Sequence, residues 1–211
     1  QVNDAKAVVL NSQIILTPVL VESEGRTFSY WFKDDACQDL LSKNEVSDDI
    51  TLHGGWQYTL TIDPTGGDMA EPEKTRKVVF NHKYGALPTT SMTGYTFLRW
   101  ATKKEEGSEV TKDTTLEAQN DATIYAQWRI NQYNLTFDLG NGTIDTKKVD
   151  YNSPIVYPTN LSWEEHVFNG WDKEGETKMP ANDLYITASW TINKYNVTFN
   201  FDNETITSSI L

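Results

Sequence analysis

The sequence contains very little cysteine and histidine. Cys37 is its one cysteine, and its three histidines are His53, His82 and His166. A single cysteine excludes an internal disulfide framework and any cysteine-based zinc cluster. The histidines lack a His-x-x-x-His spacing and have no cysteine near them in the sequence. We therefore expect them to be structural, and the sequence predicts no metal and no cofactor.

Basic residues are also scarce, because 18 Lys and Arg stand against 30 Asp and Glu, for a net charge of −12. Binding to phosphate groups requires clustered Lys and Arg, so this balance argues against nucleic acid and against an anionic membrane surface as partners. A membrane-spanning helix requires about 18 or more consecutive apolar residues, and no such run occurs. The sequence therefore predicts no membrane insertion.

Tryptophan, by contrast, is abundant and regularly placed. Six of the seven tryptophans lie in three pairs of similar stretches. The first stretch of each pair contains Phe-x-x-Trp, at 28–31, 97–100 and 168–171. The second stretch ends in Trp56, Trp128 or Trp190. Equivalent tryptophans recur about every 70 residues, a period that is too long for a solenoid turn and suits an array of small domains.

This period divides the chain into repeats. Residues 1–57 form a first repeat that appears without its opening strand, 58–130 a second, 131–192 a third, and 193–211 the start of a fourth. The joints between them are short and contain neither Gly nor Pro. We therefore expect a semi-rigid rod that advances on the order of 30 Å per repeat.

Side-chain alternation predicts a mainly β fold, with α+β as the upper limit of helix content. Tyr58, Leu60 and Ile62 alternate with threonines, which places three apolar side chains on one face of a strand. Ile124, Ala126 and Trp128 share a face in the same way. These patterns favour core positions for the repeated tryptophans over an exposed, sugar-binding row of rings.

Two local features are harder to interpret. Phe97 and Trp100 are three residues apart, so strict alternation would place them on opposite faces. Either a β-bulge lies between them or the strand is covered on both sides, and we favour coverage on both sides. The segment 34–41 reads as a brief capped helical turn.

The assembled motifs resemble the Listeria–Bacteroides repeat family, the B-repeats of internalin-type surface proteins. The matching residues are Tyr58–Ile62 with Gly66–Gly67, Gly94–Trp100, Tyr125–Trp128 and Met179–Asp183. The third repeat departs from the family pattern at Glu165, where glycine is usual. The resemblance implies small β-grasp-like modules of about 60–70 residues and a place in secreted or cell-surface adhesins. It brings no catalytic residues with it.

Two features are candidate sites. Trp163 lies outside the repeated pattern between Ser162 and Glu164, so it is the candidate for an exposed aromatic that contacts a ligand. The segment 140–144 has the middle of a calcium-binding loop, but the flanking ligand positions hold Phe137 and Lys148 where carboxylates are required. Its Asn-Gly pair instead predicts a hairpin turn.

Five Asn-x-Ser/Thr sequons would be N-glycosylation sites in a eukaryotic secretory host and have no meaning in a bacterium. They begin at Asn134, Asn141, Asn160, Asn196 and Asn203.

The function predicted from these observations is non-catalytic. No Gly-x-Ser-x-Gly motif is present, and modules of this size rarely form a deep cleft. We expect an extracellular or cell-surface repeat region that acts as a stalk or spacer and makes weak protein or adhesion contacts. The alternative is a carbohydrate-binding accessory region of a secreted enzyme. The partner would then be a glycan receptor instead of a protein.

The sequence also predicts strand-swapped self-association. A first repeat without its opening strand and a fourth repeat that has only begun invite strand donation between neighbouring molecules. Light scattering over increasing protein concentration should then show dimers. A strict monomer at high concentration would remove this prediction.

Overall fold

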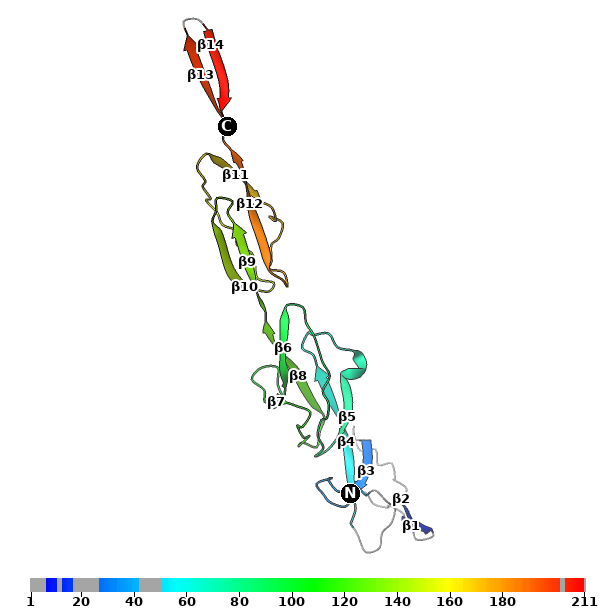
Figure 1. Ribbon diagram of the computed structural model, residues 1–211. Coiled ribbons are helices and arrows are strands. Elements are labelled where there is room, and N and C mark those ends of the chain that lie inside the picture. The colour runs from blue at the N-terminus through cyan, green and yellow to red at the C-terminus, as the bar shows by residue number, and fades with distance from the viewer. Residues whose placement is uncertain (1–6, 11–12, 17–26, 42–50, 202–203, 211) are drawn as a thin grey trace. The chain divides into compact units, whose positions relative to one another are not determined.

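The computed structural model describes residues 7–10, 13–16, 27–41, 51–201 and 204–210 (Figure 1). Within these ranges the chain is built from strands, together with one short 3-10 turn, η1 (Glu71–Glu73). No helix among the described residues is long and apolar enough to cross a membrane. The prediction of a mainly β protein is confirmed. The chain divides into two compact units, Gln1–Met92 with Phe97–Trp128, and Thr93–Thr96 with Arg129–Leu211.

The second unit contains a four-stranded mixed sheet. Its strands are β9 (Gln132–Asp138), β10 (Ile144–Asp150), β11 (His166–Trp171) and β12 (Leu184–Ile192), in the spatial order β10-β9-β12-β11. The two central strands, β9 and β12, are parallel, and each outer strand is antiparallel to its neighbour. The first and last strands of the third repeat therefore form the middle of the sheet.

The first unit repeats this plan with additions. Its strands are β3 (Thr27–Phe32), β4 (His53–Asp63), β5 (Thr75–Val79), β6 (Tyr95–Ala101), β7 (Glu109–Val110) and β8 (Ala122–Ile130). Their order is β3-β4-β8-β6-β7, with β5 on the other edge of β4. The central pair, β4 and β8, is again parallel.

Two smaller hairpins complete the described strands. β1 (Ala7–Leu10) pairs with β2 (Gln13–Leu16), and β13 (Tyr195–Phe201) pairs with β14 (Glu204–Ile210). The first repeat was predicted to lack an opening strand in its first few residues. Residues 1–6 lie outside the described ranges.

β4 is continuous through the predicted boundary at residue 57. Gln57 pairs with Thr27 of β3 on one edge and with Val79 of β5 on the other. The predicted first and second repeats therefore share one strand of 11 residues. These two repeats are joined by backbone hydrogen bonds on both edges of β4, without an intervening linker.

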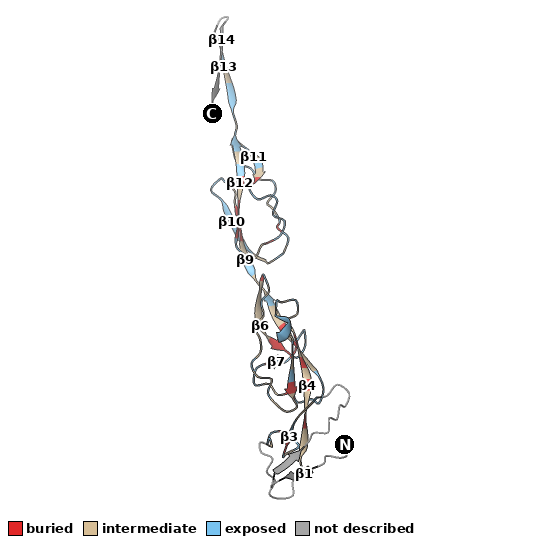
Figure 2. Ribbon diagram, turned by 90° about the vertical axis from the view of Figure 1, so that its right-hand side faces the viewer, coloured by how far each residue is buried: buried red, intermediate tan, exposed pale blue. Residues whose placement is uncertain are grey.

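Each of the two larger sheets, one in each unit, has one apolar core. In unit 1 the core contains Tyr58, Leu60 and Ile62 from β4, together with Ile124 and Ala126 from β8. Each of these side chains is at most 3% exposed, which confirms the predicted inward alternation. In unit 2 the core is formed around the fully buried Leu135, Phe137 and Ile186 of the two central strands. Figure 2 shows the contrast with β10, which is largely exposed.

The prediction that the Phe-x-x-Trp strand is covered on both sides is wrong, and a β-bulge is the correct explanation. The strand register shifts between Phe28 and Trp31, and again between Phe168 and Gly170. The extra residue returns the second ring to the same face as the first. In the second repeat the rings of Phe97 and Trp100 lie 5.4 Å apart and both pack in the unit 1 core.

Glycine in the first hairpin turn makes room for the closing tryptophan. A Cβ atom on Gly67 would lie 2.5 Å from the ring of Trp128, and one on Gly140 would lie 2.8 Å from Trp190. The indole N–H of Trp128 donates to the Pro64 carbonyl at 3.0 Å, and that of Trp190 donates to a carbonyl of the equivalent turn. Turn and tryptophan are therefore one packing unit.

The segment 34–41 contains a turn and no helix, which corrects the prediction made from its sequence. The carboxylate of Asp34 accepts the backbone N–H groups of Gln38 and Asp39, at 3.0 and 2.7 Å. The chain does not continue as a helix because Cys37 adopts a left-handed φ of 57°.

The core assignment of Trp100 gives a direct test. Its ring is 4% exposed, and its indole N–H donates to the Pro88 carbonyl at 3.1 Å. Trp100→Ala should cost about 3–5 kcal/mol, which is comparable to the whole stability of a domain this small. Calorimetry should then show loss of the transition of the second repeat while the third repeat melts as before.

Leu98→Ala is the matched control, because this side chain is on the same strand and is 51% exposed. It should leave both transitions nearly unchanged. A Trp100→Ala variant that melts like the unchanged protein would contradict the core assignment.

Candidate functional site

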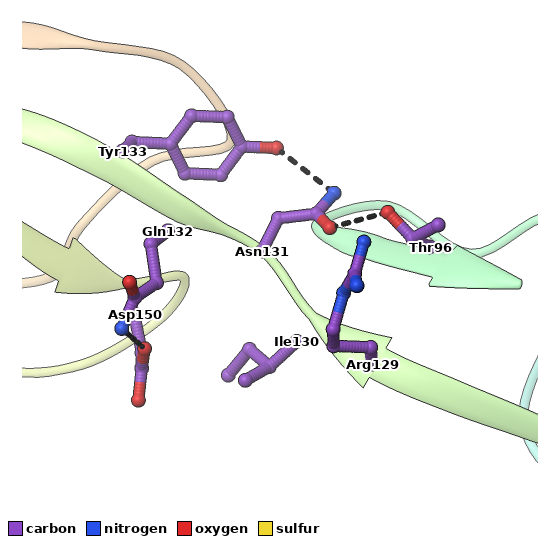
Figure 3. Close-up of a pocket in the computed structure, with 7 residues that line it drawn as sticks. All are labelled: Thr96, Arg129, Ile130, Asn131, Gln132, Tyr133 and Asp150. Atoms are coloured by element: carbon purple, nitrogen blue, oxygen red, sulfur yellow. Dashed lines mark hydrogen bonds between the residues drawn. The ribbon is translucent and has the colours of Figure 1, made fainter. Parts of the chain in front are cut away.

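The candidate site in unit 2 is an open cavity of about 710 Å³ where β9 begins (Figure 3). Its lining residues come from three separate stretches of this unit and are mostly polar: Thr96, Arg129, Ile130, Asn131, Gln132, Tyr133 and Asp150. Asn131 separates the end of β8 from the start of β9.

Asn131 is bonded through both its side chain and its backbone. Its side-chain oxygen accepts the hydroxyl of Thr96 at 2.5 Å, and its side-chain nitrogen lies 3.5 Å from the hydroxyl of Tyr133 (Figure 3). Its backbone N–H donates to the Gly94 carbonyl, and its carbonyl accepts the N–H of Tyr151, both at 2.9 Å. Most of the polar capacity of this residue is therefore satisfied within the unit.

The carboxylate of the cavity, that of Asp150, is paired as well. Gln132 donates from its amide nitrogen to Asp150 at 2.8 Å. A catalytic or ligand-binding cavity usually presents convergent polar groups that have no protein partner. In this cavity the side chains of Asn131 and Asp150 are bonded to neighbouring residues, which is typical of a structural joint.

The same joint recurs before β13. The side-chain nitrogen of Asn193 lies 3.2 Å from the Tyr195 hydroxyl, and its backbone N–H donates to the Glu165 carbonyl at 2.7 Å. The sequence signal for both joints is Ile-Asn-x-Tyr-Asn, at 130–134 and 192–196. Sequence reasoning noted these joints only as short linkers and missed this repeated motif.

At the boundary between the first two repeats no asparagine is present. Tyr58 occupies the position of Tyr133, but its hydroxyl is buried and has no hydrogen-bond partner among the described residues. Trp56 stands where Asn131 stands in the next joint. The continuous β4 strand replaces the asparagine bridge at this boundary.

Gly94 packs directly against the aromatic ring of Tyr151. The ring of Tyr151 occupies the place where a Cβ atom on Gly94 would lie, and the rings of Tyr95 and Tyr151 meet edge-on at 6.0 Å. Gly94 has a φ of 78°, and Glu165 takes the equivalent turn with a φ of 59°. The expected departure at Glu165 therefore keeps the turn conformation despite its side chain.

Trp163, predicted as an exposed aromatic, is half-buried. Its ring stacks on His166 at 3.7 Å and meets Trp190 edge-on at 5.7 Å. One face of the indole is thus covered by the imidazole. A ligand-contacting role for Trp163 stays a prediction, and its packing shows that it also supports the end of the third repeat.

The candidate glycosylation sites have different environments. Asn141, Asn160 and Asn196 are exposed. Asn134 is half-buried, and its side chain donates to the carboxylate of Asp183 at 2.9 Å. Asn203 lies outside the described residues.

The predicted hairpin turn at 140–144 is confirmed. The N–H of Leu139 donates to the Thr143 carbonyl at 2.9 Å, and Gly140 and Gly142 have φ values of 78° and 88°. β9 and β10 pair directly on either side of this turn. Among the described residues, no three His, Cys, Asp or Glu side chains are grouped to hold a metal ion.

Cys37 and His82 converge, although they belong to different repeats. The Nε2 atom of His82 lies 2.6 Å from the Cys37 carbonyl, so the contact is with the backbone and not with the thiol. Burial, followed by the charges of Asp34 and Asp35, raises the pKa of the thiol. A nucleophilic cysteine requires a lowered pKa. This pair therefore has a structural role, because it joins the turn at residue 37 to the segment around residue 82.

A second hollow, of about 670 Å³, lies beside the turn that follows β4 in unit 1. Its charged groups are paired: Lys104 lies 3.5 Å from Asp63 and over the ring of Tyr125, and Lys74 lies 2.6 Å from Glu71. Exposed pairs of this kind contribute about 0–1 kcal/mol each.

Fold and joints together define a tandem array of small mixed-sheet repeats. The sequence profile of the Listeria-Bacteroides repeat domain matches residues 58–127 and 133–192, which is more than half of the chain. The chain belongs to the Listeria–Bacteroides repeat family.

Individual relatives agree with this assignment. The chain is 36% identical over 145 residues to "Internalin H" of Listeria monocytogenes, which covers 64% of this chain and 25% of the relative. Two proteins of Evansella cellulosilytica, named "Putative membrane protein" and "Putative Gly-rich membrane protein", are 26% and 29% identical over 204 residues. These two alignments cover 88% of this chain, and 30% and 23% of the relatives. The chain thus spans less than a third of the length of each.

The left-handed backbone of Glu165 gives a test of the turn. Glu165→Gly should stabilise the third repeat by about 0.5–1 kcal/mol. Relief of about 1–2 kcal/mol of left-handed strain is partly offset by the greater freedom of glycine in the unfolded chain, about 0.4–1 kcal/mol. Thermal denaturation followed by circular dichroism measures the change.

Gly94→Ala is the contrasting variant at the equivalent turn. It should be destabilising, because the Tyr151 ring fills the space that the new methyl group requires. A Glu165→Gly variant that is less stable than the original would show that the Glu165 side chain itself stabilises this turn.

Proposed function

We propose that the chain is a non-catalytic repeat region of a secreted or cell-surface protein, where it acts as a stalk or spacer and makes weak protein-interaction or adhesion contacts. The observation that carries this proposal is the joint. Asn131 and Asn193 each bond backbone groups and the tyrosine hydroxyl of their own joint. Their polar groups are therefore used to hold the joint together. Membership of an internalin-type repeat family supports the same role.

The extracellular or cell-surface location rests on the relatives. One relative is named an internalin, and two others carry "membrane protein" in their names. The acidic charge of −12 is compatible with an exposed, soluble segment of such a protein. Attachment to a cell wall belongs to this proposal and would be provided by other parts of the polypeptide.

A β-grasp-like fold for each repeat is part of the proposal. The order β10-β9-β12-β11, with parallel central strands, supports it, because a β-grasp sheet also places its first and last strands together in the middle. The crossover from β10 to β11 contains no helix, which is the main difference from a ubiquitin-like domain.

The alternative function is a carbohydrate-binding accessory region of a secreted enzyme. Its supporting observation is Trp163, which is partly accessible at the end of the third repeat and lies beside the exposed carboxylates of Glu164 and Glu165. Sugar sites combine an aromatic ring with polar hydrogen-bonding groups. The stacking of His166 on one face of the ring weighs against this alternative.

A glycan array separates the two functions. The unchanged chain should show no specific glycan binding that depends on Trp163. Trp163→Ala should lower the melting temperature of the third repeat, because the contacts with His166 and Trp190 are lost.

Val156→Ala is the control, since this side chain is 70% exposed in the same repeat. Specific glycan binding that disappears in Trp163→Ala and persists in Val156→Ala would favour the carbohydrate-binding function over the stalk. Melting curves of both variants show whether the loss has a trivial cause in unfolding.

A further inference from the structure

β5 and β10 are two of the edge strands of the larger sheets in the described part of the chain. β5 pairs with β4 alone, and β10 pairs with β9 alone. An open strand edge presents unpaired backbone N–H and C=O groups and is a template for pairing with another chain. A second copy of the same chain carries the same open edges, so it is the partner that such edges invite.

Both strands carry a basic residue at the same position of the register. Arg76 of β5 lies opposite Leu60 of β4, and Lys147 of β10 lies opposite Leu135 of β9. Directly opposite residues of antiparallel strands share a face of the sheet. Leu60 and Leu135 are both buried, so Arg76 and Lys147 are on the core face of their strands.

Lys147 lies at the open end of the unit 2 core. Its ammonium group is 5.8 Å from the ring centre of Phe137, which is fully buried, yet Lys147 itself is exposed. A strand that added to the edge of β10 would extend the core face past this ammonium group. Pairing would therefore remove a charge from water, which is costly without an acidic partner.

The cation of Arg76 carries an energetic cost, because part of it is buried without a hydrogen-bond partner in the described part of the chain. Its Nη1 atom donates to the Ala86 carbonyl at 2.6 Å, but Nε and Nη2 are buried and have no hydrogen-bond partner among the described residues. Burial lowers the pKa of the guanidinium, and no carboxylate compensates for it. A buried donor without a partner destabilises a fold. Stability therefore does not explain why a cation stands here.

We propose that Arg76 and Lys147 are edge guards: inward-facing cations that prevent a second copy of this chain from adding a strand to β5 or β10. The inference goes beyond the stalk role and does not depend on it. Inward-pointing charges on edge strands are one of the ways in which β proteins avoid edge-to-edge association.

Each guard has a neighbouring residue that serves as a matched control. Lys148 follows Lys147 but lies opposite Asn134, and Lys77 follows Arg76 but lies opposite Thr59. Successive residues of a strand point to opposite faces. Replacing guard or control by valine removes the same charge from the same strand and adds the same β-branched side chain.

The test in unit 2 compares Lys147→Val with Lys148→Val in the full chain, by sedimentation velocity over micromolar to millimolar concentrations. Lys147→Val should self-associate at a concentration at least about tenfold lower than Lys148→Val, a difference well above the error of a dissociation constant. Hydrogen exchange in the associated sample should show new protection of the amides of β10.

The test in unit 1 compares Arg76→Val with Lys77→Val and adds a stability measurement. Arg76→Val should raise the melting temperature of unit 1, because a buried guanidinium with two unpaired nitrogens is replaced by an apolar side chain beside Val78. It should also promote self-association. Lys77→Val should neither raise the melting temperature nor promote self-association. It removes only the contact of the Lys77 ammonium group with the Thr59 hydroxyl at 3.0 Å.

Three results would overturn the proposal. Guard variants that stay monomeric at all concentrations would show that the edges are closed by something else. Equal association of guard and control variants would show that net charge, and not the facing of the cation, prevents pairing. Loss of stability in Arg76→Val without association would show that the guanidinium is a packing element of the core.

Discussion

The parallel pairing of the first and last strands of each repeat is the constraint on which the rest of the structure depends. Because β9 and β12 run in the same direction, the chain leaves the third repeat at the end opposite to the one where it entered. The opening strand of the next repeat can then begin at once. In unit 1 no residues at all separate the two predicted repeats, since β4 runs without interruption through the predicted boundary at residue 57.

That constraint also explains where the family motifs occur. The closing tryptophan, as in Trp128 or Trp190, follows the segment of the last strand that pairs with the first strand. It therefore packs on the first hairpin turn, where only glycine leaves room for the indole. The Gly-rich turn and the terminal tryptophan are far apart in sequence, but each requires the other.

Sequence reasoning was sufficient where a pattern depends on one strand alone. The alternation of Tyr58, Leu60 and Ile62 and the glycine turn at 140–144 were both predictable, because face and turn geometry are local properties. The bulge between Phe168 and Gly170 was not, because it is a difference in register between two strands. Alternation within β11 carries no information about β12.

The candidate site could be predicted only in part, for a related reason. Trp163 was recognised as irregular, but its contact with Trp190 depends on the closing strand, which returns to it from later in the chain. The asparagine joints were visible as a repeated Ile-Asn-x-Tyr-Asn motif. The role of Asn131 became clear only with the carbonyl of Gly94 and the amide of Tyr151 in place, and neither residue is near it in sequence.

The distribution of satisfied and unsatisfied polar groups supports a connecting role over a binding role. In the joint cavity, where a ligand site was sought, Asn131 and Asp150 have protein partners. Among the described residues, the buried donors without a hydrogen-bond partner belong to Trp31, Tyr58 and Arg76, and those of Arg76 lie at a sheet edge where pairing with another strand would be harmful. A chain whose joint residues Asn131 and Asp150 are hydrogen-bonded within their own unit, and which carries a cation on an open strand edge, is suited to a connecting role.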